Sequence, residues 1–295
     1  MYVIVGANGF LGRYLIRTIL YNTDSEIIGI VRNPEGLPDL SRVQWIKCDI
    51  TDKSDFEHTR RILNQGGPYD IIYLAAYHNP DLVAVNPILA WNINITALTE
   101  FLNGITNLNS FYYTSTDSVY GVSDNGYHFK ENDPVNPVNI YGWQKVAAES
   151  LVHSYKHHTV RFPFLLGPSL SLGKKHFYDN IFETLCTGNI IEMFSDSLRS
   201  ALDFQTAANL LIQVIELGKS CDIPLTLNIS GDEDLSKYEI GIRIAHKALK
   251  PDKLVKPISI HQNDHIFKTP RAASTLMDNG RLKKLLNLPK IQMQL

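Results

Sequence analysis

A glycine-rich turn at the very start of the chain constrains the fold more than any other feature. Residues 1–12 read MYVIVGANGFLG, so a short apolar run leads into three glycines spaced three residues apart. Leu11, Leu15 and Ile19 then recur at helical spacing, as one buried helix face requires. A strand, a glycine turn and a helix in this order present backbone N–H groups and a positive helix end to an anion. The segment therefore predicts a site for a dinucleotide pyrophosphate at Gly6, Gly9 and Gly12.

The first half of the chain continues this alternation of strands and helices. Helical patterns cover Phe10–Leu20 and Pro87–Asn103. The expected strands are Tyr2–Val5, Glu26–Val31, Val43–Lys47, Ile71–Leu74, Ser110–Ser115 and His158–Leu165. Strands that alternate with helices favour a parallel sheet with helices on both faces. We therefore expect an α/β protein with a Rossmann-type, doubly wound parallel sheet.

The second half has a looser pattern, which indicates a smaller mixed lobe. Ser236-Lys237-Tyr238-Glu239 has capping-box spacing and should begin a helix that runs to Leu249. The other expected elements are helices near 176–187, at Gln205–Leu217 and at Asn279–Leu286, and a strand at Leu225–Ile229. The resulting division is a dinucleotide-binding domain at 1–168, to which part of 200–230 returns, and a mainly substrate-binding lobe at 169–295.

Composition restricts the partners that this chain is expected to have. Its 295 residues carry a net charge of −2 and no long basic run, so neither nucleic acid nor a membrane surface is an expected partner. No apolar run reaches the length of a membrane helix, and no leader pattern precedes the first strand, so we expect a cytoplasmic protein. Three cysteines lack metal-ligand spacing; we expect buried free thiols and no metal.

Two residues after the early strands bear on the choice of cofactor. Arg32 stands where an NAD-binding protein usually has an acid for the adenosine ribose, and an arginine can pair with the 2′-phosphate of NADP. NADP(H) is therefore favoured over NAD(H), although Arg32 could also be an ordinary surface arginine. Asp49 ends the third strand in the stretch CDITD, where it could accept from an adenine amino group or simply form a turn.

A hydroxyl, a phenol and an amine form the candidate catalytic set. Tyr141 and Lys145 lie four residues apart in YGWQK, and side chains at this spacing share one face of a helix. An ammonium beside a phenol would lower the pKa of the tyrosine and make Tyr141 a usable acid. Thr116, at the end of the preceding strand, could hold a substrate carbonyl. The Tyr-x-x-x-Lys pattern is common by chance, but its combination with the glycine turn favours hydride transfer to a carbonyl.

Together these motifs resemble the extended short-chain dehydrogenase/reductase family, whose members act on nucleotide sugars. The matching stretches are GANGFLG at 6–12, the Asp49 motif, LAAYHNP at 74–80, Asn94, STDSVYG at 115–121, YGWQK at 141–145, RFPFLLGP at 161–168 and RAASTLMD at 271–278. The resemblance implies that Thr116, Tyr141 and Lys145 are the catalytic set. It also implies cofactor contacts from Ala75 and Ala76, and from Phe162 and Pro163 near the nicotinamide. Further cofactor contacts are expected from Asn8, Phe10, Leu11, Ile50, Tyr77, Asn94 and Thr114.

Within this family the chain is most similar to the branch of dTDP-4-dehydrorhamnose reductase-like enzymes. Dehydratases carry an Asp-Glu pair after the threonine, whereas this chain has Asp117 and Ser118, and a serine cannot serve as their base. The implied activity is NAD(P)H-dependent reduction of a nucleotide-activated keto-deoxy sugar. Asp117 and Ser118 would bind the substrate, and Arg199 and Arg271 are the expected cationic partners of its diphosphate, with Lys174 or Lys175 as alternatives.

Two other functions and one assembly state stay open at this stage. The Val-Tyr-Gly end of the STDSVYG motif is more typical of epimerases, so a 4-epimerase with tightly held NAD is one alternative. A non-catalytic NADP-binding regulatory subunit is the other, because some proteins of this fold have lost catalysis. The family resemblance also permits a homodimer through the helix that carries the tyrosine.

Overall fold

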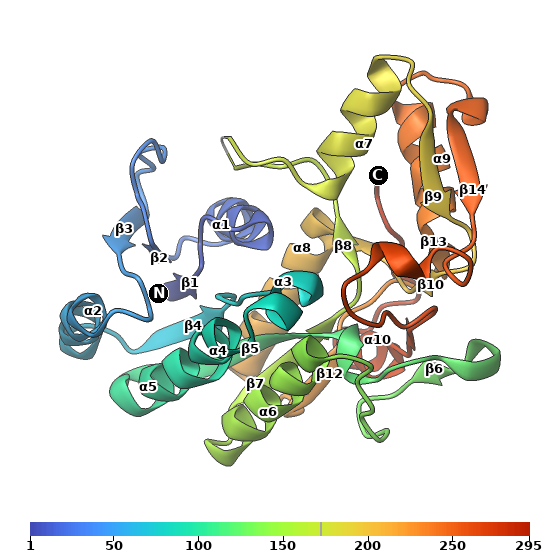
Figure 1. The fold of residues 1–295 in the computed structure, drawn as a ribbon. Helices are drawn as coiled ribbons and strands as arrows, with labels where there is room; N and C mark the ends of the chain where they lie inside the picture. Colours follow the sequence, from blue (N-terminus) through green and yellow to red (C-terminus); the bar gives the residue numbers. More distant parts are fainter. Residues whose placement is uncertain (172) are drawn as a thin grey trace.

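A seven-stranded parallel sheet forms the centre of the computed structural model, which describes residues 1–171 and 173–295 (Figure 1). The spatial order is β12-β7-β5-β4-β1-β2-β3, and every neighbouring pair is parallel. The strands are β1 (Tyr2–Val5), β2 (Ile27–Val31), β3 (Val43–Lys47), β4 (Tyr69–Tyr73), β5 (Leu108–Thr116), β7 (His158–Phe162) and β12 (Thr226–Asn228). This arrangement confirms the expected α/β fold with a Rossmann-type sheet.

Alternation along the strands supplies both faces of the sheet with apolar side chains. In β1, Tyr2 and Ile4 belong to one core cluster and Val3 and Val5 belong to the other, because successive strand residues point to opposite faces. The first cluster packs against α1 (Phe10–Asn22), α8 (Phe204–Gly218) and α10 (Gly280–Leu286). The second packs against α2 (Lys53–Gln65), α5 (Ala97–Gly104) and α6 (Ile140–Ser154). The sheet is thus covered on both faces, as a parallel sheet requires.

A smaller group of elements lies beyond the carboxyl ends of the sheet strands, at the upper right of Figure 1. Its core joins α7 (Phe177–Cys186), β9 (Ile191–Phe194), α9 (Lys237–Lys247) and β14 (Val255–Ile258). Short paired strands connect it to the sheet: β6 (His128–Phe129) with β15 (Leu276–Met277), β8 (Leu165–Leu166) with β11 (Leu202–Asp203), and β10 (Leu198–Arg199) with β13 (Leu235–Ser236). Within the described residues, no helix has the length and apolar character needed to cross a bilayer.

Two of the expected elements differ from the observed ones: a helix contains a π-helical turn, and a strand ends early before a proline. The helix expected over 87–103 is preceded by α3 (Pro80–Val85) and consists of α4 (Pro87–Trp91), a π-helical turn (Asn92–Thr96) and α5. Pro87 occupies the first helical turn, where a missing N–H costs little. The strand expected over 158–165 ends at Phe162, because Pro163 has no N–H for the ladder.

The cysteine expectation was wrong for two of the three thiols. All three are free, and Cys48 is buried, but Cys186 and Cys221 are exposed. Cys186 is the last residue of α7, and Cys221 lies in the turn that follows α8, so neither faces the core.

Candidate active site

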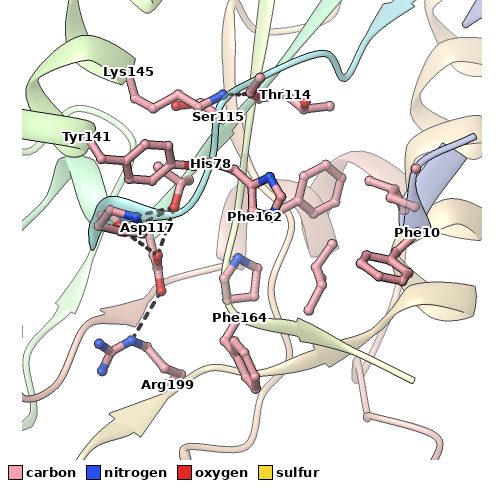
Figure 2. A pocket seen from close by; sticks show the side chains of 18 of the residues that line it. Phe10, His78, Thr114, Ser115, Asp117, Tyr141, Lys145, Phe162, Phe164 and Arg199 are labelled. Atoms are coloured by element: carbon pink, nitrogen blue, oxygen red, sulfur yellow. Dashed lines mark hydrogen bonds and ion pairs between the residues drawn. The ribbon is translucent and has the colours of Figure 1, made fainter. Parts of the chain in front are cut away.

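A cavity of about 590 Å³ lies at the carboxyl ends of the sheet strands. Its wall combines the glycine turn after β1, the end of β5, the start of α6 and the segment after β7 (Figure 2). The first part of the sheet runs outward from β1 through β2 to β3, and the second part runs from β4 through β5 to β7. The cavity is therefore at the topological switch point, where open α/β sheets bind ligands.

Two glycines allow the tight backbone of the turn after β1, one through its conformation and one through close packing of the helix against the turn. Gly6 has φ +87, and a Cβ on Gly12 would lie 2.6 Å from the carbonyl oxygen of Ala7. Gly9 is the N-cap of α1; no side chain caps this helix, and its first turn contains no acid. The free N–H groups and the positive helix end are thus available for an anion. These features fit a dinucleotide cofactor.

The Tyr141 phenol lies against the end of β5, but its pKa shift is opposite to the sequence expectation. Burial raises the pKa of Tyr141 above its usual value, the charge of Asp117 adds to this, and the Thr116 hydroxyl acts in the opposite direction. Lys145 is not among the groups that shift it. The expectation that Lys145 lowers the pKa of Tyr141 was therefore wrong for this structure. The buried phenol keeps its proton at neutral pH.

Lys145 instead directs its amine toward strand β5. Its Nζ donates to the hydroxyl of Tyr113 at 3.0 Å, and to the carbonyl oxygen of Thr114 at 2.9 Å (Figure 2). Burial lowers the pKa of Lys145 to about 8, while the carboxylate of Glu149 favours its charged form. Lys145 is thus a buried donor, still mostly protonated at neutral pH, on the same cavity wall as Tyr141.

Asp117 and Arg199 form an ion pair beside the phenol, in the lower left of Figure 2. The Nε of Arg199 lies 3.4 Å from an oxygen of Asp117, and the Thr116 hydroxyl donates to the other oxygen at 3.0 Å. Burial raises the pKa of Asp117, whereas Arg199, Thr116 and Ser118 lower it. Among the lining residues that the structure describes, Asp117 is the one carboxylate.

Arg271 reaches the cavity from the C-terminal lobe. Its Nη2 donates to Asp81 of α3 at 2.8 Å, and the backbone N–H of Lys268 donates to the same carboxylate at 2.9 Å. The guanidinium also lies 5.2 Å from the ring centre of Phe267. These contacts tie the segment 268–271 to α3, beside the cavity.

The cavity brings together most of the residues selected from the sequence. Those that line it are Gly6, Gly9, Phe10, Leu11, Gly12, Ala76, Thr114, Thr116, Asp117, Ser118, Tyr141, Lys145, Phe162, Pro163, Arg199 and Arg271. Those outside its lining are Asn8, Arg32, Asp49, Ile50, Ala75, Tyr77 and Asn94. The Asn94 side chain accepts from the N–H of Tyr77 and donates to its carbonyl oxygen and to the side-chain oxygen of Gln144. It therefore holds the segment after β4 against α6.

Arg32 and Asp49 lie near one another just after β2 and β3. Arg32 is exposed, and its charge contributes to lowering the pKa of Asp49, after the larger effect of hydrogen bonds from Thr51. The Asp49 side chain accepts from both the N–H and the hydroxyl of Thr51, which is the turn geometry that the sequence left open. The turn formed by Asp49 and Thr51 is compatible with contact between Asp49 and a cofactor at this edge of the sheet.

Several lining residues were not chosen individually from the sequence. Leu74, His78, Pro80, Ser115, Phe164 and Leu165 lie within the matching stretches, whereas His176, Ser197, Phe204, Lys237, Ile260 and Phe267 come from other segments. Lys174, an alternative partner of the diphosphate, also lines the cavity. His176 packs between Phe10 and Phe204 at ring distances of 4.7 and 4.9 Å, and burial lowers its pKa to about 4. It is a neutral, packed histidine. No short motif marks such residues, since only folding brings them to the site.

Comparisons with known proteins assign the chain to a family. The family described as "RmlD substrate binding domain" matches residues 1–295. The chain is similar to methionine adenosyltransferase 2 subunit beta from Bos taurus, with 24% identity over 96% of this chain and 81% of that protein. It is similar to dTDP-4-dehydrorhamnose reductase from Aggregatibacter actinomycetemcomitans, with 23% identity over 97% and 93%.

A solved structure shows the same fold over nearly the whole chain. The dTDP-4-dehydrorhamnose reductase of Bacillus anthracis, in complex with NADP, superposes with a TM-score of 0.75 at 23% identity, covering 99% of this chain and 94% of that one. The match over all 295 residues, the glycine turn and the Thr116–Tyr141–Lys145 wall are consistent with one another. The chain belongs to the RmlD substrate-binding domain family, within the extended short-chain dehydrogenase/reductase class of NAD(P)-dependent oxidoreductases.

Proposed function

We propose that this protein reduces a keto group of a nucleotide-activated deoxy sugar, with Tyr141 as the proton donor. The observation that carries the proposal is the buried Tyr141 phenol, which keeps its proton and lines the same cavity as the glycine turn. A reduction needs a group that gives a proton to the developing alkoxide, and a protonated phenol meets this need. The Thr116 hydroxyl at the end of β5 would orient the carbonyl oxygen.

The chain's own residues would hold the cofactor in this cavity. The glycine turn would bind its diphosphate, Lys145 would bind a ribose hydroxyl, and Phe162 and Pro163 would pack near the nicotinamide. When bound, the nicotinamide supplies the hydride. Exposed Arg32 at the end of β2 supports NADP(H), because it offers a guanidinium to a 2′-phosphate.

The cavity chemistry favours reduction over dehydration. Removal of water requires a base in addition to the acid, and Asp117 is the one carboxylate among the described lining residues. Asp117 is already paired with Arg199, and Ser118 next to it has no basic group. Reduction needs no such base: it requires the substrate carbonyl to be held beside the nicotinamide and a proton donor to lie within reach of the carbonyl oxygen.

Substitution of Tyr141 tests the proposal. In a panel of dTDP- and UDP-keto sugars, the wild-type protein should oxidise NADPH, and Tyr141→Phe should lower kcat by about 10²-fold or more. Tyr21→Phe is the matched control, because Tyr21 is 89% exposed and far from the cavity lining. Full turnover by Tyr141→Phe would remove this residue from the mechanism.

The similarity to a protein named as a subunit of methionine adenosyltransferase supports a second candidate, a non-catalytic binding subunit. This candidate predicts NADPH binding without turnover on any sugar of the panel. The epimerase alternative predicts instead that the protein is purified with bound nicotinamide and interconverts sugars without added reductant. NADPH oxidation, NADPH binding and the nicotinamide content of the purified protein, measured together on the same sugar panel, therefore separate all three functions.

Exposed apolar side chains support the proposed homodimer. Ile88 and Trp91 of α4, and Ile140 and Trp143 of α6, are between 46% and 78% exposed and line one shallow depression. Burial of such a patch would favour association. Trp143→Glu should convert a dimer to a monomer in sedimentation analysis, and a wild-type protein that is already monomeric would contradict the proposal.

A further inference from the structure

Lys237 is a cavity-lining cation that the family motifs do not include. It is the first residue of α9, and its Nζ lies 5.7, 5.6 and 5.7 Å from the ring centres of Phe164, Phe177 and Phe194. In the part of the chain that the structure describes, it takes part in no hydrogen bond or ion pair. Its ammonium is thus held by aromatic faces alone, at the cavity wall.

The position of Lys237 is electrostatically unfavourable without a ligand. A cation at a helix N-terminus faces the positive end of the helix dipole. The acid in the first turn of α9, Glu239, is occupied by the capping box with Ser236. Burial, together with the smaller effects of the charges of Arg199 and Arg271, lowers the pKa of Lys237 to about 8. The fold therefore concentrates positive charge here and leaves it uncompensated.

The two arginines beside Lys237 differ in the donors that they have left. Arg199 donates from its Nη atoms to the carbonyl oxygens of Leu198, Ala272 and Ala273 and pairs with Asp117 through Nε. Its guanidinium is thus largely used to hold the lobe and Asp117 in place. Arg271 has one acid partner, Asp81, and its buried Nη1 has no acceptor in the described part of the chain. Among the three cations at this end of the cavity, Lys237 and Arg271 have donors to spare.

This charged region is separate from the other two parts of the cavity. In Figure 2, Phe164 and Arg199 lie at the end away from Lys145, while Phe10 of the glycine turn lies to the side. Phe164 is one of the rings around Lys237. Its contact with Phe164 places Lys237 toward the Arg199 end of the cavity, so we assign a group bound there to a second ligand and not to a diphosphate held at the glycine turn.

We propose that Lys237, together with Arg271, binds the diphosphate of the nucleotide-linked substrate, and that Arg199 acts as a positioning residue for Asp117. The assignment of the substrate class rests on the proposed function. Five lysines and arginines and one carboxylate line the described cavity, so its charge suits an anion. The phenylalanine rings exclude water, which strengthens the attraction between an ammonium and a phosphate oxygen. The ammonium of Lys237 and the unpaired Nη1 of Arg271 can donate to different phosphate oxygens.

Calorimetric titration of the full chain, saturated with NADPH, tests the assignment. The probes are dTDP, UDP and inorganic pyrophosphate, with thymidine and glucuronate as ligands that lack a diphosphate. Lys237→Met should weaken dTDP or UDP binding at least tenfold and leave any thymidine binding unchanged, whereas Lys237→Arg should stay within about threefold of wild type, since each tenfold corresponds to about 1.4 kcal/mol. Lys247→Met, at the exposed end of the same helix, is the matched control.

Each remaining outcome decides against the assignment. Unchanged diphosphate binding by Lys237→Met would overturn it, as would a wild-type protein that binds glucuronate but none of the diphosphate probes. Lys237→Met should fold, because methionine fills the same aromatic enclosure without a charge, and Lys237→Arg provides a charged second variant. The assay measures binding alone, so loss of the Tyr141 mechanism in the turnover assay would leave this result interpretable.

Discussion

Removal of one partner from the buried ion pair between Glu149 and Arg161 should strongly lower the free energy of unfolding. Glu149 lies on α6, one turn after Lys145, and Arg161 lies on β7. Arg161 donates to the two carboxylate oxygens at 2.9 and 2.6 Å, and the side chains are 6% and 4% exposed. Arg161 also donates to the Tyr120 hydroxyl at 2.8 Å and to the Glu131 carbonyl at 3.2 Å. This bidentate pair fixes α6 to the sheet.

Removal of Glu149 alone leaves a buried guanidinium without its counter-charge. For a pair enclosed to this degree, Glu149→Leu should lower the free energy of unfolding by about 3–5 kcal/mol. At roughly 2–4 °C per kcal/mol for a chain of this size, the thermal midpoint should fall by roughly 6–20 °C. The double variant Glu149→Leu/Arg161→Met removes both charges and should recover most of this loss, because apolar side chains can replace a buried pair at little net cost.

Denaturant unfolding followed by circular dichroism measures these differences. The matched control is the ion pair between Lys175 and Glu183, which has the same 2.6 Å separation but 60% and 54% exposed side chains; Lys175→Met should cost less than about 1 kcal/mol. A loss below about 1 kcal/mol for Glu149→Leu would refute the reasoning. So would a double variant whose loss equals the sum of the two single losses, because the pair would then have no coupling.

Three further outcomes follow from the same structure. Gly12→Ala places a Cβ 2.6 Å from a backbone carbonyl oxygen, so it should weaken NADPH binding at least tenfold and cost about 1–3 kcal/mol of stability. Gly126→Ala strains a backbone with φ +73 but has open space around it, so it should also cost stability and yet keep NADPH affinity in the same titration. Arg32→Ser should weaken NADPH binding about tenfold and leave NADH binding almost unchanged, and an equal loss for both would contradict the role of Arg32 at the 2′-phosphate. Burial lowers the pKa of Lys145 and Lys237 from 10.5 to about 8, so the unfolded chain binds more protons between these values, and the free energy of unfolding should rise from pH 8 to 10. Replacement of both lysines by methionine should flatten this rise, as measured by denaturant titrations at each pH. An unchanged dependence of the free energy of unfolding on pH would contradict the assignment of the rise to these two lysines.

Local sequence chemistry was enough to predict the sheet and the position of the cavity. The strand at 2–5, the glycine turn and the following helix are encoded within about twenty consecutive residues, and each depends on short-range sterics and periodicity. The same holds for Tyr141 and Lys145, whose shared helix face follows from their spacing. For this reason most of the expected site residues line one cavity.

The direction of each side chain was decided by tertiary contacts. Lys145 could reach Tyr141 on helical spacing alone, but the packing of α6 on β5 offers it the Tyr113 hydroxyl and the Thr114 carbonyl instead. Burial, which no spacing reveals, then raises the pKa of Tyr141. The phenol is therefore protonated at neutral pH, as any tyrosine would be, but it is a weaker acid in this structure than the spacing to Lys145 led us to expect.

Sequence by itself determined which residue types are available and which short segments form strands, turns and helices, because these depend on neighbours along the chain. Only the tertiary structure decided which cations have an acceptor and which do not. Arg199 is used by Asp117 and by carbonyls more than seventy residues away, whereas Lys237 meets aromatic rings from three separate segments. Desolvation and charge pairing act through space, so they appear only when distant segments are packed together.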